Sequence, residues 1–417
     1  MTSSHLLTLL FLIAVVASVA TRLWLGARQR AHVIAHRAAT PEDFRGAVSD
    51  EEHQRAADYT VAKLSLARWD LLLGAALLLA WTLGGGIDLA SVAVASLDLP
   101  SLASGIILLL AIALISDLLM LPLEAVSTFG VEAEFGFNRQ TPALFLRDRL
   151  LGWALLIALG GPLAAALISL LERAGDLWWL WAWLVWSSFS LALVWAYPRF
   201  IAPLFNRFEE LSDPELRARL EALLTRCGFT SRGLQVMDGS RRSNHGNAYF
   251  TGFGRNRRIV LFDTLLESLD PAEVEAVLAH ELGHYRLNHV KQRMVLSLAM
   301  SLAGFAVLGW CAAQPWFHMS LGVSLPSSAS MLALFALASP PFLFWVTPLA
   351  AAWSRRQEYA ADRFAKQHTD AGDLISALVK LYCENASTLT PDPAYVRFHY
   401  SHPPAIDRIG ALRNSHG

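Results

Sequence analysis

The stretch His280-Glu281-Leu282-Gly283-His284 decides how the rest of this chain is interpreted. Two histidines four residues apart lie one turn apart on the same face of a helix, so both imidazoles can bind one metal ion. Glu281 can then take a proton from a water molecule activated by that metal. Upstream, Asp270-Pro271-Ala272-Glu273 is typical of a helix start, with an N-cap, a first-turn proline and a capping-box glutamate. We therefore expect the motif to lie about two turns inside a helix.

This HExxH arrangement is typical of zinc proteases, and the alternative is an amphipathic helix with two solvated histidines. A catalytic zinc also needs a third protein ligand and an open coordination position. Glu358 is the best candidate for that ligand, and Asp362 follows one turn later, where its carboxylate can accept a hydrogen bond from a ligand histidine. His289 falls five residues past His284, off the ligand face, so we expect it to be solvated or to contact a ligand from behind.

Composition places this helix in a membrane protein. Hydrophobic residues make up 54% of the chain and charged residues 17%, and the mean hydropathy is +0.39. An average soluble protein has about 25% charged residues. The net charge of −1 argues against a nucleic-acid partner. Seven apolar stretches are long enough to cross a bilayer, near Leu6–Leu25, Trp69–Leu83 (starting closer to Lys63), Leu102–Leu123, Leu150–Leu171, Leu177–Tyr197, Val295–Ala313 and Leu332–Trp353.

The distribution of basic residues predicts the orientation in the membrane. The loops after the first and third spans are rich in Arg, whereas the N-terminus and the loops after the second and sixth spans contain no Lys or Arg. The positive-inside rule then places the N-terminus outside and the C-terminus in the cytoplasm. We expect membrane helices 1–5 in residues 1–198 and helices 6–7 in residues 295–353. The two catalytic segments, 199–294 and 354–417, would then both face the cytoplasm, where they can meet.

The first of these cytoplasmic segments has an α+β pattern. A helix is expected to start at Asp213 and to end at Gly228, and Leu234–Asp238 and Arg258–Phe262 are interpreted as short strands. A further strand at Asn247–Phe250, beside the metal-binding helix, would offer free backbone groups to an extended peptide by strand addition. The alternative for this strand is an ordinary hairpin in a small sheet.

Several segments together resemble the CAAX prenyl protease 1 family, which are integral-membrane zinc metalloproteases. The segments are Glu134–Thr141 (EFGFNRQT), Pro203–Phe208 (PLFNRF), Ser243–Leu266 (SNHGNAYFTGFGRNRRIVLFDTLL), His280–His289 (HELGHYRLNH), Ser354–Asp362 (SRRQEYAAD) and Tyr400–Ile409 (YSHPPAIDRI). The resemblance extends over nearly the whole chain. It implies a mainly α-helical, polytopic membrane protein, in which seven transmembrane helices enclose a water-filled chamber and a small α+β zincin-like catalytic domain lies on the cytoplasmic side.

The resemblance also implies the metal site. It assigns one zinc ion per chain to His280, His284 and Glu358. It makes Glu281 the general base, and it makes Asp362 the hydrogen-bond partner of a ligand histidine.

The substrate-binding residues implied by the resemblance come from two other segments. Asn247, Ala248 and Tyr249 would lie on the edge strand that binds the substrate. His402 and Arg408 would lie near the cleft, where a cation or a hydrogen-bond donor can stabilise the oxyanion. The alternative for His402 is a capping or loop histidine.

These features predict a membrane-embedded zinc metalloendopeptidase, similar to the protease that trims the C-terminal tripeptide of prenylated CAAX proteins. We expect peptide or protein substrates, prenylated or membrane-tethered, together with membrane lipid as a partner, and a monomeric protein. The Ala/Leu/Arg-rich composition and the short loops indicate a bacterial inner membrane, where prenylated CAAX proteins are few.

Two other functions stay open. One is a membrane-protein quality-control protease, or a scaffold that holds clients, with no prenyl requirement. The intact Glu281 argues against a non-catalytic scaffold. The other is a metal-binding transporter, which would need several ionisable residues at mid-membrane, whereas only Asp117 is clearly found there.

Overall fold

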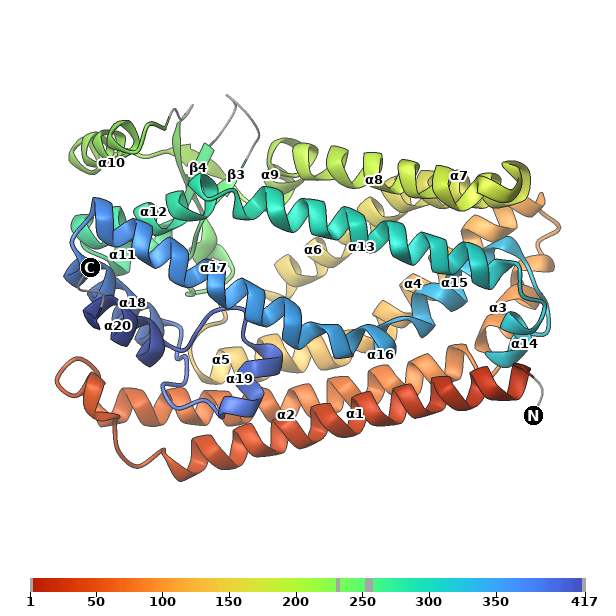
Figure 1. The fold of residues 1–417 in the computed structure, drawn as a ribbon, viewed down its shortest axis with the longest axis horizontal. Coiled ribbons are helices and arrows are strands. Elements are labelled where there is room, and N and C mark those ends of the chain that lie inside the picture. The colour runs from red at the N-terminus through yellow and green to blue at the C-terminus, as the bar shows by residue number, and fades with distance from the viewer. Residues whose placement is uncertain (1–2, 230–232, 252–257, 415–417) are drawn as a thin grey trace.

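The computed structural model describes residues 3–229, 233–251 and 258–414. Within these residues, seven helical segments are long and apolar enough to cross a membrane, which confirms the predicted number. Figure 1 shows them running roughly along the long axis of the molecule, with the polar segments gathered at one end. The seven are Ser4–Ala35, Asp50–Trp81, Ser101–Glu134, Pro142–Arg173, Gly175–Phe205, His289–Ala312 and Ser328–His368.

Most of these segments are longer than the apolar stretches seen in the sequence. Six of the seven contain 31–41 residues, and a helix of thirty residues is about 45 Å long, against about 30 Å for the hydrocarbon core of a bilayer. The second segment shows why the helices exceed the apolar stretches. A capping box starts this helix well before its apolar run. The Ser49 hydroxyl accepts a hydrogen bond from the Glu52 amide (3.2 Å), and the Glu52 carboxylate accepts one from the Ser49 amide (2.8 Å).

Among the residues that the structure describes, the membrane part consists of fourteen α-helical elements. Short π-helical turns join α4 to α5, α6 to α7 and α8 to α9. Pro340 and Pro341 interrupt the seventh segment, because proline has no backbone N–H to donate. The elements are α1 (Ser3–Ala35), α2 (Asp50–Trp81), α3 (Gly86–Ala95), α4 (Ser101–Val126), α5 (Glu132–Glu134), α6 (Pro142–Leu155), α7 (Gly161–Arg173), α8 (Trp178–Ala196), α9 (Ala202–Phe205), α13 (His289–Ala312), α14 (Trp316–Ser320), α15 (Ser328–Ala338), α16 (Pro340–Leu343) and α17 (Thr347–His368).

The last membrane helix continues without a break into the polar region. The boundary expected between residues 353 and 354 falls inside α17, and the boundary expected between residues 294 and 295 falls inside α13. Glu358 therefore lies on α17, which forms the C-terminal part of the seventh membrane segment.

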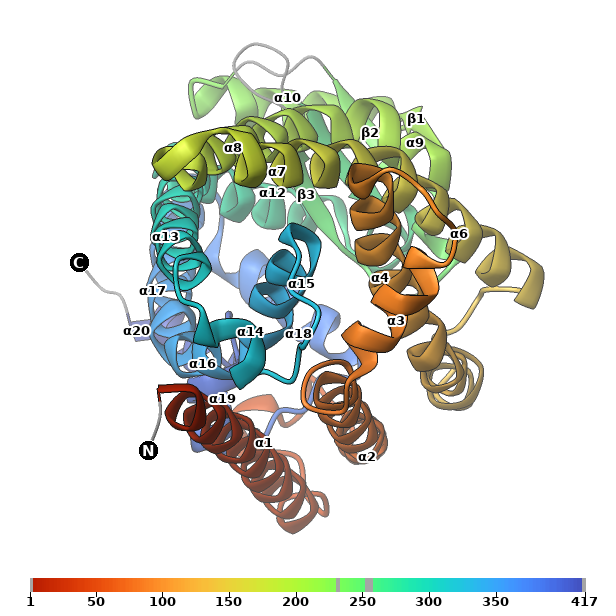
Figure 2. The ribbon, with the colours of Figure 1, turned by 90° about the vertical axis from the view of Figure 1, so that its right-hand side faces the viewer.

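The outward faces of the membrane helices carry exposed apolar side chains. On α1, Leu9, Ile13 and Val16 are all exposed. In the end-on view of Figure 2, the helices stand around the long axis, so such faces form the outer surface of the molecule. A surface of this kind is stable in lipid rather than in water, as expected of a multi-pass membrane protein.

Asp117 on α4 faces protein, as expected for an ionisable group within a span. Its carboxylate accepts hydrogen bonds from Arg149 Nη1 (2.9 Å) and Trp153 Nε1 (2.7 Å), both on α6. A second carboxylate, that of Glu124, also binds Arg149. The charge of Asp117 is thus neutralised inside the protein.

The polar region contains four strands and six helices among the described residues. The sheet has the order β1-β2-β4-β3, with β2 and β4 parallel and the other two pairs antiparallel. The helix predicted after Asp213 and the three predicted strands are present, and residues 252–257 lie outside the described residues. The elements are β1 (Phe208–Glu210), α10 (Pro214–Arg226), β2 (Leu234–Met237), β3 (Ala248–Thr251), β4 (Arg258–Phe262), α11 (Asp263–Ser268), α12 (Pro271–Arg286), α18 (Ala371–Glu384), α19 (Pro393–His399) and α20 (Ala405–Asn414).

The two polar segments share one hydrophobic core. Leu220 and Leu278 come from the first segment, and Ala365, Leu374 and Leu412 come from the second. All five side chains are almost inaccessible to solvent. Apolar burial therefore joins α12, α17, α18 and α20 into a single unit, although two membrane helices separate the two segments in sequence.

Candidate active site

The helix that carries the two histidines begins where the sequence predicts. Asp270 is the N-cap of α12, and its amide donates a hydrogen bond to Glu273 Oε2 (2.8 Å). Pro271 occupies the first turn, where its missing N–H costs nothing. His280 and His284 follow in the interior of α12, so the helix presents both imidazoles on one face.

Gly283 allows α12 to lie close against α17. A Cβ atom added at Gly283 would meet the Cα atom of Ala361 at 3.0 Å and its carbonyl oxygen at 3.1 Å. Both are backbone atoms and cannot move aside, so any side chain at this position would push the two helices apart. The close contact brings Glu358, one turn before Ala361 on α17, opposite the two histidines.

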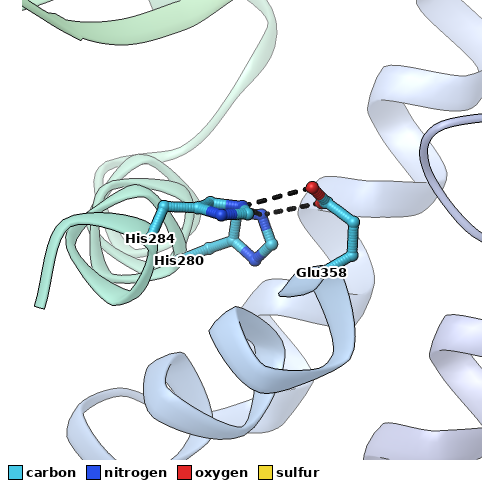
Figure 3. A group of neighbouring side chains, drawn as sticks. All are labelled: His280, His284 and Glu358. Atoms are coloured by element: carbon cyan, nitrogen blue, oxygen red, sulfur yellow. Dashed lines mark hydrogen bonds and ion pairs between the residues drawn. The ribbon is translucent and has the colours of Figure 1, made fainter. Parts of the chain in front are cut away.

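Three side-chain atoms converge between the two helices (Figure 3). The Nε2 atoms of His280 and His284 are 3.2 Å apart. Glu358 Oε2 lies 3.4 Å from His280 Nε2, and Glu358 Oε1 lies 3.3 Å from His284 Nε2. Ligand atoms held at about 2.0–2.1 Å from a tetrahedral zinc ion stand about 3.3 Å apart. The spacing of the three residues therefore fits one zinc ion.

The chemistry of these groups also fits a cation. Two imidazoles and one carboxylate form a donor set found in catalytic zinc sites. Glu358 is 1% exposed, and among the described residues its Oε2 atom is buried without a hydrogen-bond partner. Burial opposes a charge on the His280 ring, but the nearby carboxylates of Asp362 and Glu358 outweigh it and raise the pKa of His280 to about 9. The surroundings of His280 thus favour positive charge at this point.

Asp362 and Arg408 form a buried support behind His280. His280 Nδ1 and Asp362 Oδ1 are 2.8 Å apart, so the ring can donate its Nδ1 hydrogen and direct Nε2 toward Glu358. Arg408 on α20 donates to the same carboxylate from Nε (2.8 Å) and from Nη2 (2.5 Å). Asp362 therefore lies where the sequence predicts.

The position of Arg408 differs from the one expected for an oxyanion-stabilising group. Arg408 is 6% exposed and is committed to Asp362, and its Nη2 atom lies 3.3 Å from Nδ1 of His280, the ring nitrogen that does not face Glu358. A group there cannot reach the carbonyl of a peptide on the Nε2 side. The geometry suits Arg408 to holding Asp362, because two parallel hydrogen bonds fix a carboxylate firmly in place.

His289 supports the second histidine. Asn288 has a left-handed backbone conformation (φ 58°), which ends α12 and redirects the chain into α13. The turn brings His289 onto His284, and their Nδ1 atoms lie 3.0 Å apart. The expected contact of His289 with a ligand histidine is confirmed. The alternative, a solvated side chain, is wrong, because His289 is buried. If Nε2 of His284 binds the metal, its Nδ1 carries the hydrogen and Nδ1 of His289 accepts it.

Two further polar groups lie at the site. Burial raises the pKa of the Glu281 carboxyl above its ordinary value. A raised pKa brings a carboxylate closer to the range in which a general base works well near neutral pH. His402 is exposed, and its Nε2 atom lies 3.5 Å from Glu358 Oε1, so it stands at the open side of the cluster.

The edge strand β3 has unpaired backbone groups available for a peptide. The carbonyl of Asn247 accepts a hydrogen bond from the Phe262 amide (3.0 Å), and Tyr249 lies opposite Val260. Because backbone bonding alternates along an antiparallel pair, Ala248 directs its N–H and C=O away from β4. The N–H donates to Asn247 Oδ1 (2.8 Å), so among the three predicted substrate-binding residues Ala248 presents its backbone carbonyl at the free edge.

The segment just before β3 makes a contact that the sequence does not predict. His245 stacks on Phe137 (centroids 4.4 Å apart), and its Nδ1 atom lies 2.8 Å from Asn385 Oδ1. An isolated bridge between Asn138 and Ser243 holds the two backbones together. In the sequence, the two segments that make this contact are linked in one way. Glu134–Thr141 and Ser243–Leu266 both resemble segments of the same family.

Comparison with known proteins agrees with the geometry. Residues 29–207 match the family model described as CAAX prenyl protease N-terminal, five membrane helices. Residues 210–416 match the model of peptidase family M48. Together the two models cover both polar segments and six of the seven membrane segments, with the end of the first.

The chain is also similar to individual proteins. The CAAX prenyl protease 1 homolog of Arabidopsis thaliana is 38% identical over 298 residues, which cover 71% of this chain and 70% of that protein. The CAAX prenyl protease 1 of Saccharomyces cerevisiae is 35% identical over 317 residues, covering 72% and 69%. The crystal structure of S. mikatae Ste24p superimposes with a TM-score of 0.91 at 28% identity, covering 97% of this chain and 99% of that one.

Proposed function

This chain is a membrane metalloprotease of the CAAX prenyl protease 1 family, within peptidase family M48, and we propose that it is a zinc-dependent endopeptidase. The observation that carries the proposal is the convergence of His280, His284 and Glu358 beside Glu281. All three ligand atoms come from one chain, so we propose one zinc ion per chain and a monomeric enzyme.

The proposed mechanism assigns a role to each group at the site. His280, His284 and Glu358 would hold the zinc ion, which when bound would supply a Lewis acid for the substrate carbonyl and for a water molecule. Glu281 takes the proton of the attacking water and delivers it to the leaving amine. His402, at the open side, donates a hydrogen bond to the oxyanion that develops on the peptide carbonyl.

Three residues behind the ligands keep them in place. Asp362, held by Arg408, orients His280, and His289 orients His284. Such partners fix the tautomer and the ring direction of a ligand histidine. Both histidines then direct Nε2 toward Glu358 without rearrangement when the metal binds.

We propose that the substrate is an extended peptide segment added to the free edge of β3. Main-chain pairing with Ala248 provides affinity with little side-chain selectivity. Selectivity then comes from access between the membrane helices, which favours prenylated or membrane-tethered proteins. The names of the similar proteins, which are CAAX prenyl proteases, support this substrate class.

We further propose that the active site faces the cytoplasm, in a bacterial inner membrane. The support is the distribution of Arg and Lys, which are concentrated in the loops on the side of α12. The quality-control protease remains compatible with the same site and differs only in its substrates. The match to M48 peptidases does not favour the metal transporter or the non-catalytic scaffold.

One experiment tests the zinc dependence and the substrate class together. A single peptide is prepared with and without a farnesyl group and is assayed in detergent and in liposomes, with and without a chelator. We expect faster cleavage of the farnesylated peptide, slower cleavage of an unprenylated membrane-associated peptide, and loss of both on chelation, with recovery on adding zinc. Cleavage that survives chelation would contradict the zinc proposal. Equal cleavage of a soluble unlipidated peptide in bulk water would contradict selection by the membrane.

The contact between His289 and His284 predicts a loss of metal affinity in His289→Ala. Removal of a hydrogen-bond partner of a metal ligand weakens binding by roughly 10–100-fold. His289→Gln keeps a side-chain oxygen that can accept the Nδ1 hydrogen, so we expect partial recovery. The measurement is zinc retention in chelator buffers of graded strength, with exposed His36→Ala as control. Unchanged retention in His289→Ala would show that the contact does not support the metal.

A further inference from the structure

A cavity of about 390 Å³ lies between the membrane helices α1, α2, α4, α15 and α16. Its volume is in the range of ligand pockets, which hold roughly 300–1,000 Å³. Most of its lining is apolar and includes Val15 of α1, Trp81 of α2 and Met120 of α4. Two ionisable side chains also line it, Arg22 on α1 and Asp70 on α2. None of its lining residues takes part in the proposed catalytic mechanism.

The two charges of this cavity lack partners within the protein. Among the described residues, none forms a hydrogen bond or an ion pair with the Arg22 guanidinium or with the Asp70 carboxylate. The guanidinium lies over the ring of Phe344, 6.0 Å from its centroid, and this contact uses none of its N–H groups. By contrast, the charge of Asp117 is neutralised by Arg149. Ionisable groups within membrane segments normally pair with one another, so two unpaired ones in a single cavity indicate a binding site.

Two tryptophans mark the level of the membrane at which these charges lie. Trp24 on α1 and Trp69 on α2 are both more than half exposed (53% and 57%), and the guanidinium of an arginine lies over each ring. Exposed tryptophans beside basic residues are typical of the membrane–water interface. Arg22 shortly precedes Trp24, and Asp70 directly follows Trp69, so both charges lie on the membrane side of these rings. This is the level of the lipid headgroups.

The rest of the cavity suits an acyl chain. Val15 and Trp81 lie about two and three helical turns from the charges, toward the middle of the bilayer. Two hydroxyls in the lining donate to carbonyls of their own helices, Ser18 to Val15 (3.0 Å) and Ser116 to Ile112 (2.7 Å). The indole N–H of Trp81 donates to Ser116 Oγ (2.8 Å). These polar groups are satisfied within the protein, so this part of the cavity presents an apolar surface to a ligand.

The matching ligand carries an anion and a cation at the head of an apolar chain. A phosphate suits Arg22, because a guanidinium can donate two parallel hydrogen bonds to it. A primary ammonium suits Asp70, because it can donate a hydrogen bond to the carboxylate, whereas a trimethylammonium group has no N–H to donate. A phosphoethanolamine headgroup has both groups. A phosphoglycerol headgroup lacks the cation and leaves Asp70 unpaired.

We infer that this cavity binds one phospholipid with an ethanolamine headgroup, its phosphate on Arg22, its ammonium on Asp70 and an acyl chain between α1, α2 and α4. Pro340 and Phe344 line the cavity at the point where the seventh segment is interrupted before α17. The bound lipid therefore contacts the joint that precedes the helix of Glu358. The inference does not depend on the proposed peptidase function.

The test is lipid retention by the purified full-length protein, measured by native mass spectrometry. The protein is mixed in detergent with equal amounts of ethanolamine, choline and glycerol phospholipids that have the same acyl chains. We expect one molecule of the ethanolamine lipid per chain, with roughly 10-fold preference over the glycerol lipid, since a charge-assisted hydrogen bond distinguishes the two headgroups. Free phosphoethanolamine, which has no acyl chain to bury, should not compete at the same concentration.

Two substitutions separate the contributions of the two charges. Asp70→Asn removes the anion, so this variant should still retain a phospholipid but without preference for ethanolamine. Arg22→Gln removes the contact with the phosphate and should lower the retention of all three lipids by roughly 10-fold. Arg30→Gln and Asp176→Asn make the same changes of charge at exposed positions outside the cavity and should behave like the wild type.

Asparagine has the same shape as aspartate, so the result for Asp70→Asn stands even where Arg22→Gln does not fold. Equal retention of the three lipids by the wild type, or a preference for ethanolamine that Asp70→Asn leaves unchanged, would overturn the inference. Retention of farnesol in place of the phospholipid, at equal concentration, would assign the cavity to an isoprenyl chain and would overturn it as well.

Discussion

Replacement of Glu281 by Gln is expected to leave the fold and the bound zinc in place and to lower kcat by roughly 10³-fold or more. General-base catalysis contributes roughly 10²–10⁴-fold, and the amide of glutamine cannot accept the proton of the attacking water. Glutamine has nearly the same volume as glutamate, so the packing of α12 should not change. The measurement is the single-turnover rate of peptide cleavage by protein whose zinc content has been determined by elemental analysis.

The control for this variant is Glu384→Gln, at the exposed end of α18. It removes the same charge from the same polar region without a contact at the site, and its rate should equal that of the wild type. A decrease larger than about 10⁴-fold in Glu281→Gln would indicate that the water molecule is also displaced. Cleavage by Glu281→Gln at close to the wild-type rate would remove Glu281 from the mechanism.

Replacement of Glu358 by Ala is expected to cause the largest loss of metal. It removes one of three protein ligands and leaves two imidazoles whose Nε2 atoms are 3.2 Å apart. Loss of a partner that only supports a ligand costs roughly 10–100-fold in affinity, so loss of the ligand itself should cost more. We expect less than stoichiometric zinc after dialysis against a weak chelator, and peptidase activity close to background.

Glu358→Gln distinguishes loss of the ligand from loss of packing. Glu358 is buried, so alanine also leaves a space between α12 and α17, whereas glutamine fills it. We expect Glu358→Gln to bind zinc weakly as well, because the charge that balances the cation is absent. One full equivalent of zinc in both variants, with unchanged activity, would show that another residue completes the site.

The features predicted correctly from sequence depend on residues within one continuous segment of the chain. The capping box at Asp270, the spacing of His280 and His284, and the apolar length of the spans are all of this kind, since each is a property of a continuous segment. The prediction for His289 assumed that α12 continues through it, and a continuous helix would turn its side chain away from His284. The left-handed Asn288 ends the helix instead, and asparagine is one of the few residues that adopt this conformation readily.

By itself, the sequence determined that this chain crosses the membrane seven times and carries a metal-binding pair on one helix, because hydrophobic length and helical period are local properties. Only the tertiary structure decided what surrounds that pair. The backbone contact at Gly283 sets Glu358 opposite the histidines, and Arg408 reaches Asp362 from the last helix. Asn385 lies against His245 in the same way. These contacts join residues far apart in the chain, and burial of a shared core, rather than any local preference, brings them together.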